Sequence, residues 1–379
     1  MNTTTRLIFF SCLSQILIHL LAYWTSYLPL FDASPDLVQT SKWSKPLLRW
    51  DMFHFAHIAE QGYVYEHEWA FFPGLPFVLS FWNANNMLWA GGMISVACDT
   101  TLVLYRLSLY HFESPNLAFL VALLSLLPSS PATMRMAPYN EPFFTYFSYR
   151  GLLYCTQSKW FFATLCFALA GAFRSNGVLL SGFILWGILI QPFLESGKPP
   201  TIISSYIKSV VYTATIFTPF VYHQVTGYIA FCTSGVNAEP WCSKSIPVIY
   251  SHVQSKYWNS GFMRYWTLAQ LPNFIIAAPP FIVIFAYSVH ILRNGLKRRS
   301  SSSLALIPHA IHACILCCTL LFTSHVQIIL RLAPSMPLLY WAAAWLFMCH
   351  PKVSNLWIGW SVVWGATSVL LWSVFLPPA

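Results

Sequence analysis

Long apolar runs follow one another along nearly the whole chain and leave few ways for it to fold. About 20 mostly apolar residues cross a bilayer as a helix. With 57% hydrophobic and 8% charged residues, the 379-residue chain is also far from the composition of soluble domains. We therefore expect an all-α polytopic membrane protein with a single membrane domain over 1–379 and about eleven transmembrane helices, near 7–31, 86–105, 116–128, 142–155, 160–172, 177–194, 201–222, 271–292, 304–323, 336–350 and 355–376.

The basic residues predict how these helices are oriented. Arg6 precedes the first run and no small-residue cleavage signal follows it, so we expect a retained helix with a cytosolic N-terminus. Alternation then places Arg106 and the basic run 293–299 in the cytosol, as the positive-inside rule requires. Loops 32–85 and 223–270 would face the lumen and form the active-site face. The net charge of +9 is spread over short loops, which argues against a nucleic-acid-binding protein.

The first of these loops concentrates acidic residues. Six of the eleven acids of the chain lie in it: Asp32, Asp36, Asp51, Glu60, Glu66 and Glu68. At about 100° per residue, 50–61 predicts an amphipathic helix lying on the membrane surface with its apolar side towards the bilayer. One stripe of this helix is polar or amphipathic and the other apolar: Trp50, His54, His57 and Gln61 against Met52, Phe55, Ala56 and Ala59.

Asp51 is the candidate general base of this loop. A carboxylate at the membrane interface, partly desolvated and oriented by a neighbour such as His54, suits proton transfer from a sugar hydroxyl. The alternative is an interfacial carboxylate paired with Arg49. Glu60 is a further catalytic candidate and His57 a further active-site candidate. The spacing of the two histidines and Glu60 resembles a metal site, but the three residues drift around the helix, so we expect no metal.

Three more ionisable residues stand at the ends of apolar runs. Glu141 begins such a run, where an acid either meets the helix dipole favourably or contacts a substrate. Arg174 and Arg331 fall on the predicted luminal side, which the positive-inside rule disfavours. Phosphate binding would explain both arginines, since a guanidinium offers a fixed fork of donors, although an ordinary loop end is the alternative. Gln327 precedes Arg331 and is a further candidate.

The second luminal loop mixes aromatic, amide and basic side chains. Such a mixture suits the binding of a sugar, but tryptophan and tyrosine also form ordinary interfacial belts. Cys232 and Cys242 flank Pro240-Trp241, and the sequence leaves open whether they form a disulfide or stay free. The candidate acceptor-binding residues are Gln254, Tyr257, Trp258, Asn259, Gln270 and Asn273.

Taken together, these blocks resemble the GPI mannosyltransferase 2 family, whose members use dolichyl phosphate mannose. The resemblance covers most of the chain and rests on six blocks in family order: Arg49-Trp50-Asp51 with His54-Phe55 and His57-Ile58-Ala59-Glu60; Phe71-Phe72-Pro73-Gly74 with Pro76; Arg174-Ser175-Asn176-Gly177; Gln254 with Tyr257-Trp258-Asn259 and Gly261-Phe262; Gln270 with Pro272-Asn273-Phe274; and His325-Val326-Gln327 with Arg331.

The resemblance implies a GT-C-like helical bundle with a catalytic acid in the first luminal loop, a role that falls on Asp51. It also implies transfer of the second mannose, α-1,6-linked, to the one-mannose GPI precursor in the endoplasmic reticulum membrane, with inversion. Arg49, Arg174 and Arg331 would hold the donor phosphate. No cofactor is expected beyond the donor substrate, and an accessory subunit is left open. The alternatives are a lipid-linked sugar transporter or flippase, another dolichol-phosphate-sugar-dependent transferase and a non-catalytic scaffold.

Overall fold

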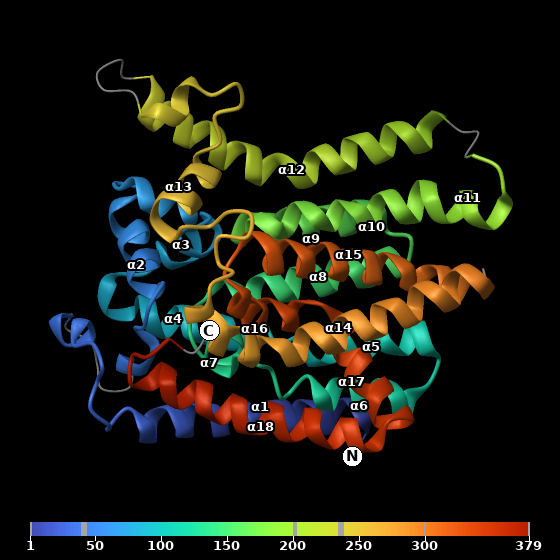
Figure 1. Cartoon of the computed structure of the whole chain (residues 1–379), viewed down its shortest axis with the longest axis horizontal. Coiled ribbons are helices and arrows are strands. Elements are labelled where there is room, and N and C mark those ends of the chain that lie inside the picture. The colour runs from blue at the N-terminus through green and yellow to red at the C-terminus, as the bar shows by residue number, and fades with distance from the viewer. Residues whose placement is uncertain (1, 39–43, 200–202, 234–238, 299, 378–379) are drawn as a thin grey trace.

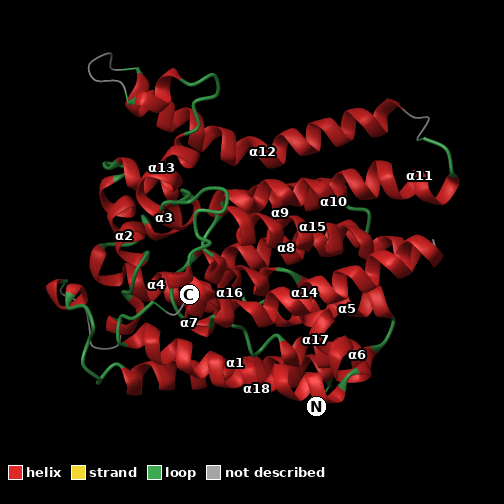
Figure 2. Cartoon of the chain, in the orientation of Figure 1, coloured by secondary structure: helices red, strands yellow, loops and turns green. Residues whose placement is uncertain are grey.

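The computed structural model describes residues 2–38, 44–199, 203–233, 239–298 and 300–377. In these ranges the chain is helical and contains no strand (Figure 2). Most of the longer helices run along one common direction and form a bundle (Figure 1). The prediction of an all-α membrane protein is therefore confirmed.

Among the described residues, six helices are long and apolar enough to cross a membrane, which is fewer than the sequence predicted. The bent pair Val326–Ser335 and Pro337–Cys349, whose parts meet at 87°, makes a seventh span if the pair is counted as one. Eleven spans are not confirmed, because predicted runs such as 116–128 and 160–172 form helices of 10 and 14 residues, Pro115–Leu124 (α6) and Trp160–Phe173 (α9). Among the described residues the six that qualify are Thr3–Thr25, Ala84–Phe112, Ser175–Ser196, Leu268–Lys297, Ser301–Thr323 and Pro351–Ser373.

The six spans and the bent pair are built from the following elements. The first is α1 (Thr3–Thr25), and the second joins α4 (Ala84–Ala97) to α5 (Thr101–Phe112). The remaining ones contain, in chain order, η4 (Ser175–Leu180), α10 (Ser181–Leu185), η5 (Trp186–Ile190), α11 (Gln191–Ser196), η7 (Leu268–Gln270), α14 (Leu271–Arg298), α15 (Ser301–Thr323), η8 (Val326–Ile328), α16 (Ile329–Leu332), η9 (Ala333–Ser335), α17 (Pro337–Cys349) and α18 (Pro351–Ser373).

A tightly packed helical hairpin lies in the middle of the bundle. It consists of α8 (Asn140–Thr156) and α9, and the long α12 (Ile203–Cys232) packs against α9. Gly151 allows the close approach of the hairpin, since a Cβ at this position would lie 2.3 Å from the ring of Phe167. Helices α14 and α15 form a second hairpin, and α1 lies beside α18 (Figure 1).

Short elements gather at one end of the bundle, on the left in Figure 1. They bring the described parts of loops 32–85 and 223–270 to the same end, where they surround the start of α8 and the end of α9. These elements are η1 (Ser34–Leu37), η2 (Lys45–Leu47), α2 (Met52–Gln61), η3 (Glu66–Ala70), α3 (Gly74–Leu79), α7 (Pro131–Arg135), η6 (Pro240–Ser243) and α13 (Ile249–Trp258).

Helix α2 is amphipathic as predicted, but protein covers its apolar side. Met52 and Phe55 are 0% and 1% exposed, and both belong to the main hydrophobic core together with Leu75 and Tyr139. The expectation that this side faces the bilayer is therefore wrong. Burying two large side chains against fixed neighbours stabilises the position of α2 by roughly 1.5–3 kcal/mol each, which holds the start of the helix in place.

Cys232 and Cys242 form a disulfide, with their Cα atoms 5.5 Å apart. The bond ties the end of α12 to η6. Trp241 in η6 is 1% exposed and packs with Trp69 and Ile249 in a small second core. Of the two states that the sequence left open, the structure therefore has the bridged one.

Candidate active site

Four charged side chains from four separate segments form one connected group. Arg331 Nη2 donates to Asp51 Oδ2 at 2.9 Å, and Arg331 Nε donates to Glu141 Oε1 at 2.6 Å. Arg174 Nη1 donates to the same Glu141 oxygen at 2.8 Å. We call these four residues the charge relay group, in the order Asp51, Arg331, Glu141, Arg174. All four were site candidates from the sequence, and the structure brings them together.

Local structure places each member at the end of a helical element. Asp51 directly precedes α2, Glu141 lies in the first turn of α8 and Arg174 caps the end of α9. Arg331 lies in α16, inside the sharply bent pair of helices. Helix ends leave backbone groups unpaired and tolerate charged side chains better than helix interiors. The group therefore forms where four helix ends converge.

The two carboxylates of the group differ in accessibility. The Glu141 side chain is 1% exposed, whereas that of Asp51 is 29% exposed and those of both arginines are 18% exposed. Glu141 is therefore suited to hold two guanidinium groups in place, while Asp51 remains open to a substrate. Each arginine uses only part of its donors on protein, which leaves N–H groups for an anion.

Buried polar atoms without a protein partner flank this group. Glu141 Oε2, Asn140 Oδ1 and Asn176 Nδ2 have no hydrogen-bond partner among the described residues. Buried polar groups are nearly always satisfied in a native protein, so such atoms are commonly explained by water or a ligand. Their positions next to Glu141 and Arg174 in the chain are consistent with a polar ligand at this site.

Tyr139 is a site residue that the sequence analysis missed. The Arg331 guanidinium lies 5.3 Å from the centre of its ring, a cation–π contact, and its hydroxyl donates to the backbone oxygen of Arg49 at 2.7 Å. Tyr139 thus connects Arg331 to the segment that carries Asp51. The only signal for it in the sequence was an aromatic residue two positions before Glu141, the acid that begins an apolar run.

Arg49 is not part of the open site. It is 0% exposed, and its guanidinium donates to backbone oxygens of Lys45, Leu48, Trp372 and Ser373. Burial lowers its pKa to about 10, so it remains charged at neutral pH. The structure therefore favours a structural clamp over the predicted contact with the donor phosphate. The alternative pairing of Asp51 with Arg49 is not formed either, because the partner of Asp51 is Arg331.

The remaining residues of α2 take other positions. His54 stacks on Phe71 with ring centres 4.8 Å apart, and burial lowers its pKa although the charge of Asp51 opposes the shift. No hydrogen bond joins His54 to Asp51 in the described part of the chain, so Arg331 is the residue that orients the carboxylate. His57 Nδ1 pairs with Glu68 Oε1 at 2.5 Å. Glu60 is exposed and has no polar partner among the described residues.

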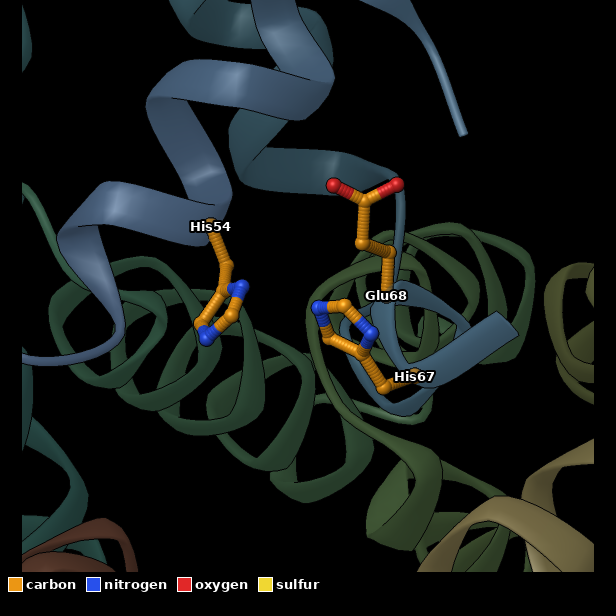
Figure 3. Close-up of side chains that lie close together, drawn as sticks. All are labelled: His54, His67 and Glu68. Atoms are coloured by element: carbon orange, nitrogen blue, oxygen red, sulfur yellow. The ribbon is translucent and has the colours of Figure 1, made fainter. Parts of the chain in front are cut away.

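In two places, three histidine or glutamate side chains lie close enough together to hold a cation, although no metal is expected from the sequence. The ligand atoms of His54, His67 and Glu68 lie within 4.8 Å of one another, and Figure 3 shows the two imidazole rings side by side with the carboxylate above them. Glu68 already accepts from His57 through Oε1 and from two backbone N–H groups through Oε2. Its oxygens therefore hold the loop together. The second group is Glu66, Glu239 and His252.

The predicted acceptor-binding residues separate into two sets. In the first set, Tyr257 donates to Glu66 Oε2 at 2.8 Å, and Trp258 lies edge-on to Phe71 at 6.0 Å. Gln254 and Asn259 belong to the same end of α13, where Asn259 takes a left-handed conformation with φ of 50°.

The second set is joined by Tyr265, which the sequence analysis did not single out. Its hydroxyl donates to Gln327 Oε1 at 2.7 Å and accepts from Asn273 Nδ2 at 2.8 Å. Asn273 also donates to Gln270 Oε1 at 2.7 Å. His325 connects the two sets, because its Nε2 lies 2.7 Å from the backbone oxygen of Trp258. Gln327 lies four positions before Arg331, so the second set adjoins the charge relay group.

Comparison with known proteins gives the family of the chain. The family model described as Mannosyltransferase (PIG-V) matches residues 6–379. GPI mannosyltransferase 2 of Cryptococcus neoformans is 33% identical over 427 residues, covering 100% of this chain and 99% of the relative. GPI alpha-1,6-mannosyltransferase 2 of Cricetulus griseus is 31% identical and covers 79% of this chain and 72% of the relative.

A solved structure, the Archaeoglobus fulgidus oligosaccharyltransferase, is 12% identical with a TM-score of 0.48 over 96% of this chain and 56% of that protein. That level of similarity adds no weight to the assignment. The match of the family model over nearly the whole sequence and the identity to full-length relatives carry it instead. The chain is therefore a member of the PIG-V mannosyltransferase family and a membrane-embedded glycosyltransferase.

Proposed function

We propose that this enzyme transfers mannose from dolichyl phosphate mannose to the one-mannose GPI precursor, forming the second, α-1,6-linked mannose. The observation that carries the proposal is the partly exposed carboxylate of Asp51, held 2.9 Å from Arg331, which in turn shares Glu141 with Arg174. A base next to two cations is the arrangement that this transfer needs. The names of the relatives support the choice of reaction.

The phosphate of the donor would bind Arg331 and Arg174 through their remaining N–H donors. In the free enzyme Arg331 pairs with Asp51. A phosphate that attracts the guanidinium would loosen this pair and leave the Asp51 carboxylate free to accept a hydrogen bond from the acceptor hydroxyl. Donor binding would thereby prepare the base, while Glu141 keeps both arginines in position.

Transfer of the mannose is a single displacement at its anomeric carbon. Asp51 takes the proton of the acceptor hydroxyl, and the hydroxyl oxygen bonds to the anomeric carbon of mannose from the face opposite the phosphate. The bond from this carbon to the phosphate oxygen breaks, and dolichyl phosphate leaves with the electron pair. The arginines stabilise the charge on the leaving group. One displacement inverts the β-linked donor to an α-linked product, and Asp51 later releases its proton to water.

The acceptor would lie along the two aromatic and amide sets next to this site. Both sets contain side chains that combine a flat apolar face or an amide with hydrogen-bonding capacity, which is suited to a sugar. Tyr257, Trp258 and Asn273 are the proposed principal contacts. Gln327, which lies in the element preceding Arg331, would connect the bound acceptor to the reacting centre.

We place this site in the lumen of the endoplasmic reticulum, with the N-terminus of the chain in the cytosol. The disulfide between Cys232 and Cys242 at the Asp51 end supports this orientation, since disulfides persist in oxidising compartments. Basic residues near the other helix ends, such as Arg106, Arg150 and Lys159, agree with the positive-inside rule. The lipid-linked donor and acceptor would be the partners of the enzyme. An assay of the purified enzyme would show whether it needs an accessory subunit.

The test is transfer of labelled mannose from dolichyl phosphate mannose by purified protein in lipid nanodiscs. We expect product with the one-mannose precursor and none with the precursor that already carries two mannoses. Asp51→Asn should lower the rate by roughly 10²–10⁴-fold, the range for losing a general base. Asp32→Asn, an exposed acid of the same loop, should match wild type. Movement of lipid-linked sugar across the bilayer without any product would support the transporter alternative instead.

A further inference from the structure

A cavity of about 770 Å³ opens at the other end of the bundle from Asp51. Its lining includes Cys155 and Thr156 at the end of α8, whereas Glu141 lies at the start of this helix. Thr156 is fifteen residues after Glu141, which corresponds to about 22 Å along the helix axis. The cavity has the size of ordinary small-molecule sites, and it is separate from the charge relay group.

The charge of the cavity differs from that of the chain. Among the described residues its lining contains Glu113 and Glu195 and neither lysine nor arginine, although the chain carries a net charge of +9. Glu195 accepts from Gln191, and the Glu113 carboxylate has no polar partner among the described residues. Two carboxylates in a described lining that contains neither lysine nor arginine favour a ligand that brings its own positive charge.

Aromatic side chains supply a second feature that favours a cation. Trp160, Trp186 and Phe183 line the cavity, and indole faces attract ammonium groups. Gly187 leaves room for the Trp160 ring, because a Cβ on Gly187 would lie 2.2 Å from it.

The helix that carries Trp186 also departs from regular α-helical geometry beside the cavity. Residues Trp186–Ile190 form one turn of π-helix in an otherwise α-helical span. Such turns are rare and are found mostly at functional sites. The irregular turn contributes both Trp186 and Gly187 to the cavity lining.

Two buried donor or acceptor atoms in the lining lack partners. Trp186 is 8% exposed, and its Nε1 has no hydrogen-bond partner among the described residues. His111 Nε2 is buried without a partner as well. An indole N–H can only donate, so a bound molecule with an acceptor oxygen would satisfy it. The cavity therefore combines sites for a cation with a free donor for an oxygen.

Exposed apolar residues border the cavity in the sequence. Tyr110, Phe161 and Phe193 are 53%, 61% and 45% exposed, and they lie in or next to the segments that form the lining. In a membrane-embedded chain such side chains face acyl chains. A ligand whose head enters the cavity could therefore leave its tails in the lipid.

We propose that this cavity binds the zwitterionic head group of a membrane phospholipid. The ammonium group would lie against Glu113, Glu195 and the indole faces, and a phosphate or ester oxygen would accept the N–H of Trp186. A zwitterion fits a lining whose described residues include carboxylates and a neutral donor but neither lysine nor arginine. The proposal is independent of mannosyl transfer and of the active site.

The test is native mass spectrometry of purified protein given equal amounts of phosphatidylethanolamine, phosphatidylcholine and anionic phosphatidylglycerol with identical chains. Wild type should retain the two zwitterionic lipids about tenfold more than phosphatidylglycerol, a preference of the order of one specific ionic contact. Free glycerophosphoethanolamine in excess should compete if the head group is what is recognised.

Two variants and a control separate the contacts. The double variant Glu113→Gln, Glu195→Gln keeps the shape of the lining and should lose the preference for zwitterionic lipids. Trp186→Phe keeps an aromatic ring, although a smaller one, but removes the N–H, and it should weaken retention of both zwitterionic lipids. Asp32→Asn removes an acid at the other end and should bind as wild type does. Equal retention of all three lipids by wild type, or an unchanged preference in the double variant, would overturn the proposal.

Discussion

Arg331 Nη2 donates a hydrogen bond to Asp51 Oδ2 over 2.9 Å, although the two residues are 280 positions apart in the chain. The same guanidinium also holds Glu141 at 2.6 Å, so Arg331 lies between an accessible carboxylate and a buried one. Glu141 cannot be reached by a substrate as easily as Asp51 can. The geometry therefore suits Glu141 to positioning the two arginines and leaves Asp51 open to a substrate.

Glu141→Gln should destabilise the protein more than any exposed acid-to-amide change. The substitution leaves Arg174 and Arg331 without the buried carboxylate that they share, and breaking a buried ion pair from one side costs about 3 kcal/mol. The midpoint of thermal unfolding in detergent should fall accordingly. Glu60→Gln, on an exposed acid without a partner, should leave the midpoint unchanged, and equal midpoints for the two variants would contradict the role of Glu141.

Arg174→Ala should weaken use of the donor more than use of the acceptor. Among the described residues its guanidinium donates only to Glu141, which leaves further N–H groups for a ligand, and a phosphate is the ligand that such donors suit. We expect the KM for dolichyl phosphate mannose to rise about tenfold, with Arg174→Lys intermediate because it keeps the charge but not the fork. Arg264→Ala, on an exposed arginine of the other loop, is the control. Equal changes in both KM values would argue for a structural role.

Hydropathy and charge predicted the helical class, the helix of residues 50–61 and the candidate residues of the charge relay group. These features depend on local composition and on which residues a bilayer tolerates. The helix count was less predictable, because an apolar run such as 116–128 forms only the ten-residue helix α6. Length along the chain does not reveal where a buried helix bends or stops.

The buried position of Arg49 and the covered apolar side of α2 escape a sequence pattern for the same physical reason. Arg49 is clamped by backbone oxygens of α18, including that of Ser373, 324 positions away. Met52 and Phe55 are covered by the protein core in the same way. A sequence pattern identifies a donor or an apolar stripe, but its partner depends on tertiary contacts. For the same reason the sequence does not identify Tyr139 and Tyr265 as residues that connect parts of the site.

The contact between the two loops should be sensitive to acid through Glu66. Burial raises the pKa of Glu66, but the hydrogen bonds from Lys256 and Tyr257 lower it more, so the net shift is downward from 4.5. A carboxylate whose folded pKa is depressed stabilises the fold above its unfolded pKa, and this contribution is lost as pH falls through the folded value. Glu66→Gln should therefore unfold at a lower temperature than wild type at pH 7.

The difference between Glu66→Gln and wild type should shrink once the pH falls below about 4.5. Thermal unfolding measured from pH 7 to pH 3.5 checks this expectation. Glu60→Gln, which lacks any such contact, should follow wild type throughout. A gap that stays constant over the whole range would mean that the ion pair with Lys256 does not hold the loops together.

Removing the disulfide should loosen the end of α12 and the loop that leads to α13. Cys232 and Cys242 are 10 positions apart, and closing a loop of this length stabilises a fold by about 2–3 kcal/mol in the chain-entropy account. The double variant Cys232→Ser, Cys242→Ser should therefore unfold at a lower temperature than wild type. Cys349→Ser, at an exposed free thiol away from this loop, is the matched control.

The same pair of cysteines also tests on which side of the membrane the site lies. In sealed microsomes, a membrane-impermeant maleimide should leave Cys232 and Cys242 unlabelled, and it should reach them only after reduction and permeabilisation. A thiol that is bridged and luminal meets both conditions, since oxidising compartments preserve disulfides. Labelling after reduction alone, with the membrane still sealed, would place this end of the bundle, and Asp51 with it, in the cytosol.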